Sequence, residues 1–172
     1  MKTIASVVTM LLAAATGWAG EMLTPGDPFP AWELTDHTGA QVSSASMAGT
    51  PYLMWYYPKA STPGCTKEGC ALRDSYADYR KLGVEVIGVS FDTPKDNAEF
   101  VSEQRFPFRL LSDRTKALAV AVGAADSPSR LWARRISYLV GGDGKVLAAY
   151  RDVDPATHAQ QVLTDLARLA SK

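Results

Sequence analysis

Cysteine and histidine are scarce in this sequence, which contains two of each: Cys65 and Cys70, and His37 and His158. A zinc site takes about four nitrogen or sulfur ligands, with spacers of about two to four residues between paired ligands. Each histidine is far from the cysteines along the chain, so we expect both histidines to be surface or capping residues. A copper carrier would need closer cysteines and a histidine late in the strand region, and residues 135–145 contain none. The sequence therefore predicts no metal and no cofactor.

An excess of charge of either sign is also absent. The chain has 18 basic and 18 acidic residues, which gives a formal net charge of +0. Proteins that bind nucleic acid or anionic membranes usually carry a basic excess. We therefore expect neither kind of partner. Internal repeats, low-complexity tracts and long linkers are missing as well, so the sequence indicates one compact unit.

Only the first residues contain a long apolar run. Residues 4–19 are apolar or small and follow a single positive charge, which predicts a secretory signal peptide over 1–19 with cleavage after Ala19. A membrane anchor usually needs about 20 apolar residues, and this run is shorter, which favours a cleaved signal over an anchor. No arginine pair precedes the run and no cysteine precedes Cys65, which argues against a twin-arginine signal and a lipidated N-terminus. We expect a soluble exported protein, periplasmic in a Gram-negative cell, without stable membrane association after cleavage.

The remaining residues, 20–172, suit one domain with a full core. Buried apolar runs predict strands, and "GGDGK" between two of them predicts a hairpin. Gly83 is a natural helix stop, and Asp154 and Pro155 suit the start of a final helix. The order is typical of an α/β, thioredoxin-like fold, with a central mixed sheet, flanking helices and an N-terminal extension. The predicted strands are 51–57, 84–90, 108–111, 136–140 and 146–150; the predicted helices are 65–82, 93–104, 115–122 and 154–170.

The two cysteines are chemically unequal on the helix predicted over 65–82. Cys65 lies in the first turn, within about 20° of Leu72 and Tyr76 on the stripe that faces the sheet, and Cys70 lies about 140° away. Free N–H groups and the helix dipole favour a thiolate at Cys65 alone. In an ideal helix the two Cα atoms are about 8.7 Å apart, whereas a disulfide tolerates about 6.8 Å. A disulfide would therefore require unwinding, which argues against a permanent staple.

Three functions remain open at this point. A thiol-disulfide oxidoreductase suits the fold and an oxidising compartment, but such proteins usually separate their cysteines by two residues rather than four. A metal-binding thioredoxin-fold protein is the weaker alternative. The third function is attack by Cys65 on a small oxidant, for which an ordinary thiol is only about 3% ionised at pH 7. Such a site must also stabilise the charge that develops as the O–O bond breaks, so it needs hydroxyl, N–H and arginine donors.

Two segments carry a resemblance to a known family. Pro58, Thr62 and Cys65 fit the Pro-x-x-x-Thr-x-x-Cys signature of peroxiredoxins, and "YPKASTPGCTKEGCALRD" (57–74) resembles the bacterioferritin-comigratory-protein or Q-type subfamily. "RISYLVGGDGK" (135–145) resembles the later strand of that subfamily, which begins with its catalytic arginine. The resemblance implies an AhpC/TSA-type thioredoxin-like domain, no metal or organic cofactor, and reduction of hydrogen peroxide and organic hydroperoxides. It also implies an antioxidant role in redox homeostasis.

The resemblance assigns a role to each cysteine. Cys65 becomes the peroxidatic nucleophile, which is oxidised to a sulfenic acid. Cys70 matches the resolving cysteine that many Q-type members carry on the same helix, so the implied product is a Cys65–Cys70 intramolecular disulfide. This is the scheme of an atypical two-cysteine peroxiredoxin, which a thioredoxin-like dithiol protein regenerates. We expect a monomer, with a dimer as the alternative.

The resemblance also assigns four supporting residues. Thr62 would hydrogen-bond the thiolate and the peroxide, and Arg135 would hold the thiolate and polarise the peroxide. Pro58 would shield the thiolate from water, and Glu68 would orient the arginine. Each residue has a simpler interpretation: Pro58 as a strand end, Thr62 as a cap, Glu68 as a partner of the helix dipole and Arg135 as an exposed charge at a strand edge.

Two neighbouring arginines, Arg130 and Arg134, compete with Arg135 for the catalytic role. Both lie in "AADSPSRLWAR" (124–134), a loop that includes Pro128 and Trp132 and is variable in the subfamily, so it is a weak guide to the pocket. Q-type proteins are usually cytosolic or plastid enzymes reduced by thioredoxin. An exported member would therefore need a reductant in its own compartment.

Overall fold

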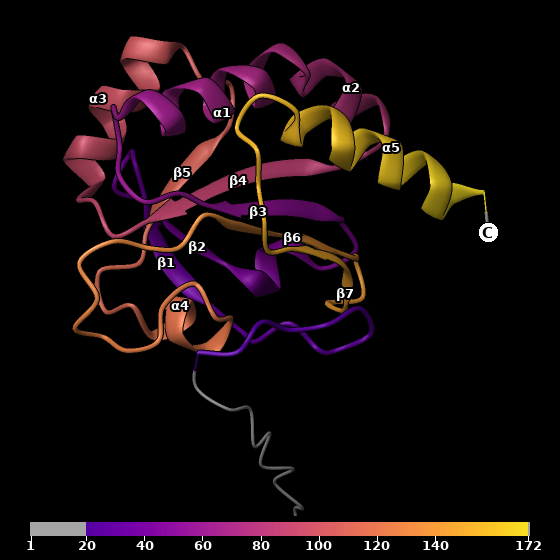
Figure 1. The fold of residues 1–172 in the computed structure, drawn as a ribbon, viewed down its shortest axis with the longest axis horizontal. Helices are drawn as coiled ribbons and strands as arrows, with labels where there is room; N and C mark the ends of the chain where they lie inside the picture. The colour runs from indigo at the N-terminus through magenta and orange to yellow at the C-terminus, as the bar shows by residue number, and fades with distance from the viewer. Residues whose placement is uncertain (1–19, 172) are drawn as a thin grey trace, which may run out of the picture.

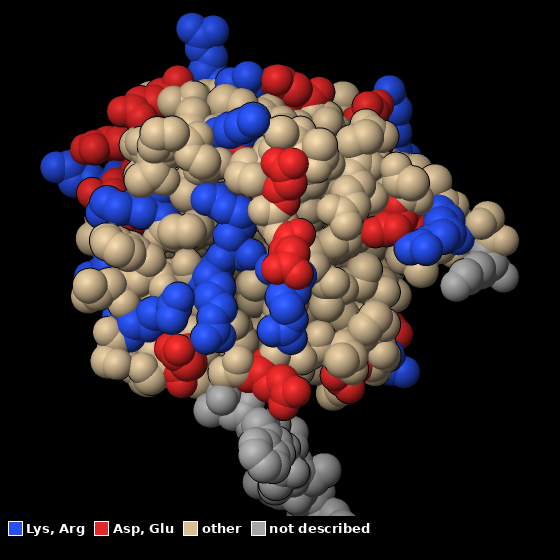
Figure 2. Space-filling model, viewed as in Figure 1, with Lys and Arg blue, Asp and Glu red and all other residues tan. Residues whose placement is uncertain are grey.

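The computed structural model describes residues 20–171, so the signal peptide predicted over residues 1–19 lies outside the described residues. Within the described part, none of the helices is long and apolar enough to cross a membrane. Basic side chains gather near the middle of the face seen in Figure 2, with acidic side chains beside them. This mixture of signs fits the balanced charge of the sequence.

In residues 20–171, seven strands form one mixed sheet with the order β2-β1-β5-β4-β3-β6-β7. The central strands β3, β4 and β5 are parallel, and β6 pairs antiparallel with β3. This arrangement confirms the predicted mixed sheet and places the start of β6 beside the end of β3. The strands are β1 (Glu33–Asp36), β2 (Gln41–Ser43), β3 (Tyr52–Tyr56), β4 (Glu85–Ser90), β5 (Arg109–Ser112), β6 (Ile136–Val140) and β7 (Val146–Tyr150).

Helices cover both faces of the sheet in the described part of the chain, and most of them lie on the same face (Figure 1). Alternate residues of β3 enter two cores: Leu53 and Trp55 pack beneath α1, α2, α3 and α5, whereas Met54 and Tyr56 face α4 and the N-terminal segment. The two-residue period of a strand explains how one apolar run supplies both cores. The helices are α1 (Pro63–Asp74), α2 (Tyr76–Lys81), α3 (Pro94–Gln104), α4 (Ala117–Ala121) and α5 (His158–Ala170), with a 3-10 helix over Ser44–Met47.

The helix predicted over 65–82 is two helices. Helix α1 begins earlier, at Pro63, and the chain leaves helical geometry at Ser75, with φ −96° and ψ 0°. Serine competes for backbone hydrogen bonds and suits such a break. Helix α2 follows and ends before Gly83, which has φ +71° and confirms the predicted stop.

The start of the final helix was also predicted wrongly. Asp154 Oδ1 accepts from the N–H of Ala156 at 2.8 Å, and its carbonyl accepts from the N–H groups of Thr157 and His158. Asp154 therefore caps a turn, and α5 begins four residues later, at His158. The hairpin strands 136–140 and 146–150 are confirmed at both ends. The N-terminal extension contains β1 and β2, which the sequence did not predict as strands.

Candidate active site

Cys65 lies in the first turn of α1, at the carboxyl edge of the parallel strands. Thr62 precedes the helix as its N-cap, with extended backbone angles, and Pro63 begins the first turn. Proline suits this position because the first helical N–H has no partner within the helix. The Cys65 side chain is buried and belongs to the core between α1 and the sheet. The sheet-facing position predicted from the helical stripe is confirmed.

Arg135 reaches Cys65 from the opposite side. It immediately precedes β6, whose first residue, Ile136, pairs with Tyr56 at the end of β3. This antiparallel register brings the guanidinium to α1, where Arg135 Nη2 lies 3.4 Å from Cys65 Sγ. The guanidinium passes close to Gly64, where a Cβ would lie 3.1 Å from Arg135 Nη2 and would shift it by a few tenths of an ångström. Residues 70 positions apart in the sequence therefore form one cluster.

Glu68 holds the other end of the guanidinium. Its Oε2 accepts a hydrogen bond from Arg135 Nη1, while its side chain is 0% exposed and that of Arg135 is 20% exposed. Burial raises the pKa of Glu68 to about 7, against the lowering influence of Arg135. Burial also lowers the pKa of Arg135, but the charges of Glu68 and Cys65 more than offset this, so that the pKa is raised. The arginine is a permanent cation with a fixed orientation.

Thr62 and Pro58 lie at the outer side of this cluster. The Thr62 hydroxyl donates to the carbonyl oxygen of Lys59 at 2.8 Å, and no hydrogen bond joins it to Cys65 Sγ within residues 20–171. Pro58 follows β3 and is half-buried. It lines a hollow of about 200 Å³ at the carboxyl edge of the sheet, together with Asp92, Trp132 and five other residues.

The two competing arginines point elsewhere. Arg134 Nη1 donates to the carbonyl of Gly123 at 3.1 Å, and its Nη2 lies 3.1 Å from Asp126 Oδ2. Arg130 donates to the carbonyl of Trp132 at 3.0 Å. Both side chains fasten the loop before β6. Of the three arginines, Arg135 is the one in contact with Cys65.

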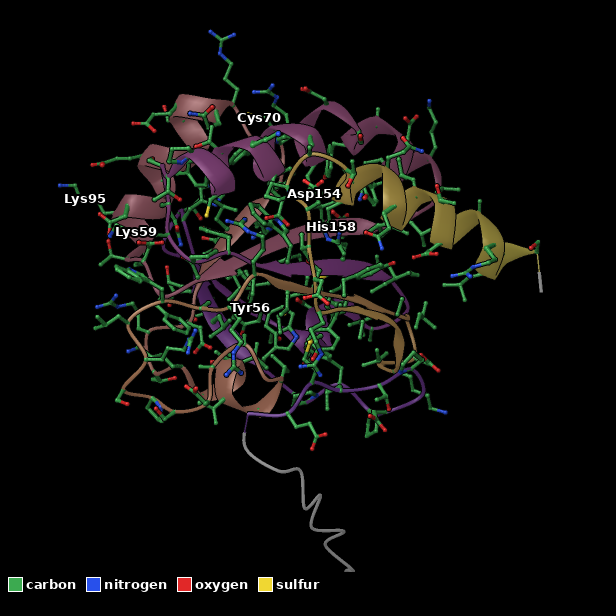
Figure 3. All side chains as sticks on the ribbon, viewed as in Figure 1. Tyr56, Lys59, Cys70, Lys95, Asp154 and His158 are labelled. Carbon is green, nitrogen blue, oxygen red and sulfur yellow. The ribbon has the colours of Figure 1, made fainter. Side chains whose placement is uncertain are left out.

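Cys70 lies further along α1, in the helical layer above the sheet (Figure 3). Both cysteines are free thiols, and Cys70 is half-buried. Its Sγ lies 3.5 Å from Gln104 Oε1, at the end of α3. The folded helix thus keeps Cys70 in a contact with α3 rather than with Cys65.

His158 was predicted as a surface or capping residue, and this is wrong. Its side chain is 0% exposed between α5 and the sheet (Figure 3), with Nε2 at 2.9 Å from Ser137 Oγ. Burial lowers the pKa of His158 to about 4, and the charge of Arg135 acts in the same direction. The imidazole is therefore neutral near pH 7 and joins α5 to β6, the strand that follows Arg135. His37 is half-buried, and its Nδ1 accepts from the N–H of Leu110 at 3.3 Å.

Other features of the described chain do not point to a second centre. Among residues 20–171, no group of three or more His, Cys, Asp or Glu side chains is placed to hold a metal ion. A larger hollow of about 520 Å³ includes Glu85 and Arg109 in its lining. These residues begin β4 and β5, so this hollow lies at the edge of the sheet opposite Cys65.

Comparisons with known proteins agree with this geometry. The model of the AhpC/TSA family matches residues 25–149. A putative peroxiredoxin of Mycobacterium tuberculosis is 37% identical over 150 residues, which cover 84% of this chain and 95% of that protein. Peroxiredoxin Bcp of Escherichia coli is 35% identical over 146 residues, covering 82% and 94%.

Solved structures show the same thioredoxin-like fold. Peroxidoxin BcpB from Mycobacterium tuberculosis superposes with a TM-score of 0.80 at 29% identity, over 87% of this chain and 99% of that one. The bacterioferritin comigratory protein of Xanthomonas campestris, studied for alkyl peroxide reduction, gives 0.77 at 31% identity, over 87% and 98%. The predicted fold is confirmed, and the chain belongs to the AhpC/TSA family, among peroxiredoxins of the Bcp and Q type.

Proposed function

We propose that the thiol-dependent peroxidase activity of this family is carried by Cys65 in this chain. The Cys65 thiolate attacks the terminal oxygen of a hydroperoxide and the O–O bond breaks. The leaving oxygen takes a proton and departs as water or an alcohol, while the sulfur becomes a sulfenic acid. The observation that carries this assignment is the contact of Arg135 with Cys65 Sγ at 3.4 Å.

Arg135 stabilises negative charge at two stages. Before attack, its guanidinium lies 3.4 Å from Cys65 Sγ and can pair with negative charge on the sulfur. During attack, the same donors lie beside the oxygen on which charge develops. Glu68 fixes the orientation of the guanidinium from a buried position. Since this geometry exists before the hydroperoxide binds, little reorganisation is needed during the reaction.

Thr62 and Pro58 complete the peroxide site. A hydroxyl that donates to the carbonyl of Lys59 keeps its lone pairs, so Thr62 can accept a hydrogen bond from the hydroperoxide. Pro58, which has no N–H and lies at the rim, limits access of water to the thiolate. Hydrogen peroxide and small organic hydroperoxides are the substrates that this arrangement suits.

Cys70 resolves the sulfenic acid. Its sulfur attacks the Cys65 sulfur, the S–O bond breaks, and the products are a disulfide and water. A thioredoxin-like dithiol protein then reduces the disulfide and returns both thiols. Both cysteines lie in one continuous helix in the reduced form. The ideal Cα separation of about 8.7 Å exceeds the reach of a disulfide, so α1 must unwind.

This scheme predicts a change in the oxidised protein. One equivalent of peroxide should reduce helical circular dichroism, speed amide exchange from Cys65 to about Arg73, and give a Cys65–Cys70 disulfide by peptide mapping. Such opening is accessible because a helix end costs less to unfold than the core. Unchanged amide exchange, or a disulfide between two chains, would show that the intramolecular scheme is incorrect.

A peroxide-consumption assay with thioredoxin and thioredoxin reductase tests the activity. The mature protein should consume hydrogen peroxide in the presence of a chelator, because the scheme uses no metal. Reduction of protein disulfides without peroxide consumption would favour the thiol-disulfide oxidoreductase instead. Loss of activity on metal removal would favour a metal site.

We also propose that the protein is exported, with residues 1–19 as a cleaved signal peptide. The proposal rests on the apolar run and small-residue ending of that segment. Mass spectrometry of the native protein from the producing cell should find an N-terminus near Gly20 or Glu21. An intact Met1 in the membrane fraction would identify the segment as an anchor. Export would place the reductant in the periplasm.

A further inference from the structure

The last turn of α3 contacts the α1 segment at three polar points. Ser61 Oγ, in the loop before α1, donates to Glu103 Oε2 at 2.9 Å. Cys70 Sγ lies 3.5 Å from Gln104 Oε1, and Arg73 Nη1 donates to the main-chain oxygen of Gln104 at 2.7 Å. The first contact is exposed, whereas the two at Gln104 are partly buried. Gln104 thus contacts both the resolving cysteine and the residue one turn beyond it.

The contact of Arg73 with Gln104 has a clear cause in the fold. Helix α3 ends at Gln104 because Arg105 adopts a left-handed conformation, with φ 55°. The last carbonyls of a helix lack partners within the helix and carry partial negative charge. The Arg73 guanidinium supplies a donor of opposite charge to one of these carbonyls.

Phe106 fixes the position of the end of α3, where Gln104 contacts Arg73 and Cys70. It lies two residues beyond the end of α3 and is buried against Gly69 of α1, and its ring stacks on that of Phe108 with the ring centroids 5.1 Å apart. Because the stacked rings of Phe106 and Phe108 join the end of α3 to the start of β5, this end stays with the sheet when the segment around Cys70 unwinds. If α1 unwinds to bring Cys70 to Cys65, both contacts at Gln104 must break.

We propose that Arg73 and Gln104 are positioning residues that hold Cys70 in the folded helix and so set the rate of disulfide formation. The inference rests on the proposed roles of Cys65 and Cys70. Breaking these contacts precedes attack by Cys70, so they lengthen the lifetime of the Cys65 sulfenic acid. A longer lifetime gives a second peroxide molecule more time to oxidise the sulfenic acid to sulfinic acid. The two residues thereby influence the peroxide concentration at which Cys65 is inactivated by oxidation to sulfinic acid.

Arg73→Ala separates this role from chemistry at Cys65. The variant should react with the first peroxide at the wild-type rate, because Arg73 does not contact Cys65. Disulfide formation should then be about fivefold faster, which corresponds to the roughly 1 kcal/mol net contribution of one hydrogen bond. Sulfinic acid at a fixed excess of peroxide should fall. Stopped-flow tryptophan fluorescence gives the two rates, and mass spectrometry gives the sulfinic acid fraction.

Three further variants make the test specific. Gln104→Ala keeps the main-chain carbonyl but removes the acceptor for Cys70, so it should also speed disulfide formation. Arg73→Lys retains a donor and should return the rate toward wild type. Arg80→Ala is the matched control, because Arg80 lies on α2, pairs with Glu85 and is half-exposed. It should leave both rates unchanged.

Amide exchange of the reduced protein provides a readout that needs no peroxidase activity. Residues 65–74 should exchange faster in Arg73→Ala than in wild type or Arg80→Ala. Equal exchange and equal disulfide rates in all three proteins would overturn the inference, even with normal oxidation of Cys65. Faster exchange in Arg73→Ala without any reaction of Cys65 with peroxide would support the holding contact and refute the proposed function.

Discussion

Replacing Cys65 by serine abolishes peroxide reduction, the largest effect expected of any single substitution in this chain. The reaction requires an ionised nucleophile, and a serine hydroxyl is almost never ionised at neutral pH, so serine cannot replace the thiolate. The replacement is nearly isosteric at a buried site, so the fold should remain. In stopped-flow experiments, the rate should fall to that of peroxide without protein.

Cys70→Ser is the matched control for this loss. The variant keeps Cys65 and Arg135, so it should show a first oxidation at the wild-type rate. Without the resolving thiol, it should then accumulate sulfenic acid, which excess peroxide drives to sulfinic acid without unwinding of α1. Residual multiple turnover in Cys65→Ser, with Cys70 intact, would move the nucleophile to Cys70 and contradict the site.

Replacing Arg135 by alanine should slow oxidation of Cys65 by about a hundredfold or more. The substitution removes a charged contact at 3.4 Å from Cys65 Sγ, and loss of one such transition-state donor typically costs about two to three orders of magnitude. It also leaves Glu68 buried without its cation, where its raised pKa favours the neutral acid. The second-order rate constant for peroxide, measured by stopped flow on the reduced protein, gives the effect.

Two nearby arginines serve as controls for that experiment. Arg130→Ala removes a half-buried side chain from the same loop, and Arg134→Ala removes the side chain next in sequence to Arg135. Neither is in contact with Cys65, so both variants should oxidise within about threefold of wild type, the range of a surface change. A near wild-type rate in Arg135→Ala, with a large loss in either control, would transfer the role to that neighbour.

The sequence predicted the parts of the fold that depend on local patterns. The strands β3, β4 and β6 are mostly apolar, and the hairpin that joins β6 to β7 carries its own turn residues. The unequal positions of Cys65 and Cys70 also followed from helical spacing alone. By contrast, the contact of Arg135 with Cys65 joins residues 70 apart, and only the resemblance to a family indicated it.

Other features depend on tertiary contacts that no local pattern encodes. The strands β1 and β2 are short, with four and three residues, and gain their stability by pairing with one another and with β5. His158 is a polar residue, yet it is fully buried and its ring pairs with Ser137, 21 positions earlier in the chain. The sequence could have predicted a buried His158, because a helix that packs against a sheet can bury the first side chain of its first turn.

Gly69 places thermal stability and catalytic turnover in competition. Glycine within a helix lowers stability by about 1 kcal/mol relative to alanine, so Gly69→Ala would ordinarily be a first choice for an engineer who wants a heat-resistant enzyme. Here Phe106 occupies the space that the new methyl group needs, and a stiffer α1 would oppose the unwinding that the disulfide requires. Replacing Phe106 by a smaller residue to make room for the methyl group would leave a cavity in the core and lower stability. Heat resistance is therefore better sought on the α4 face of the sheet, which the proposed unwinding of α1 does not involve.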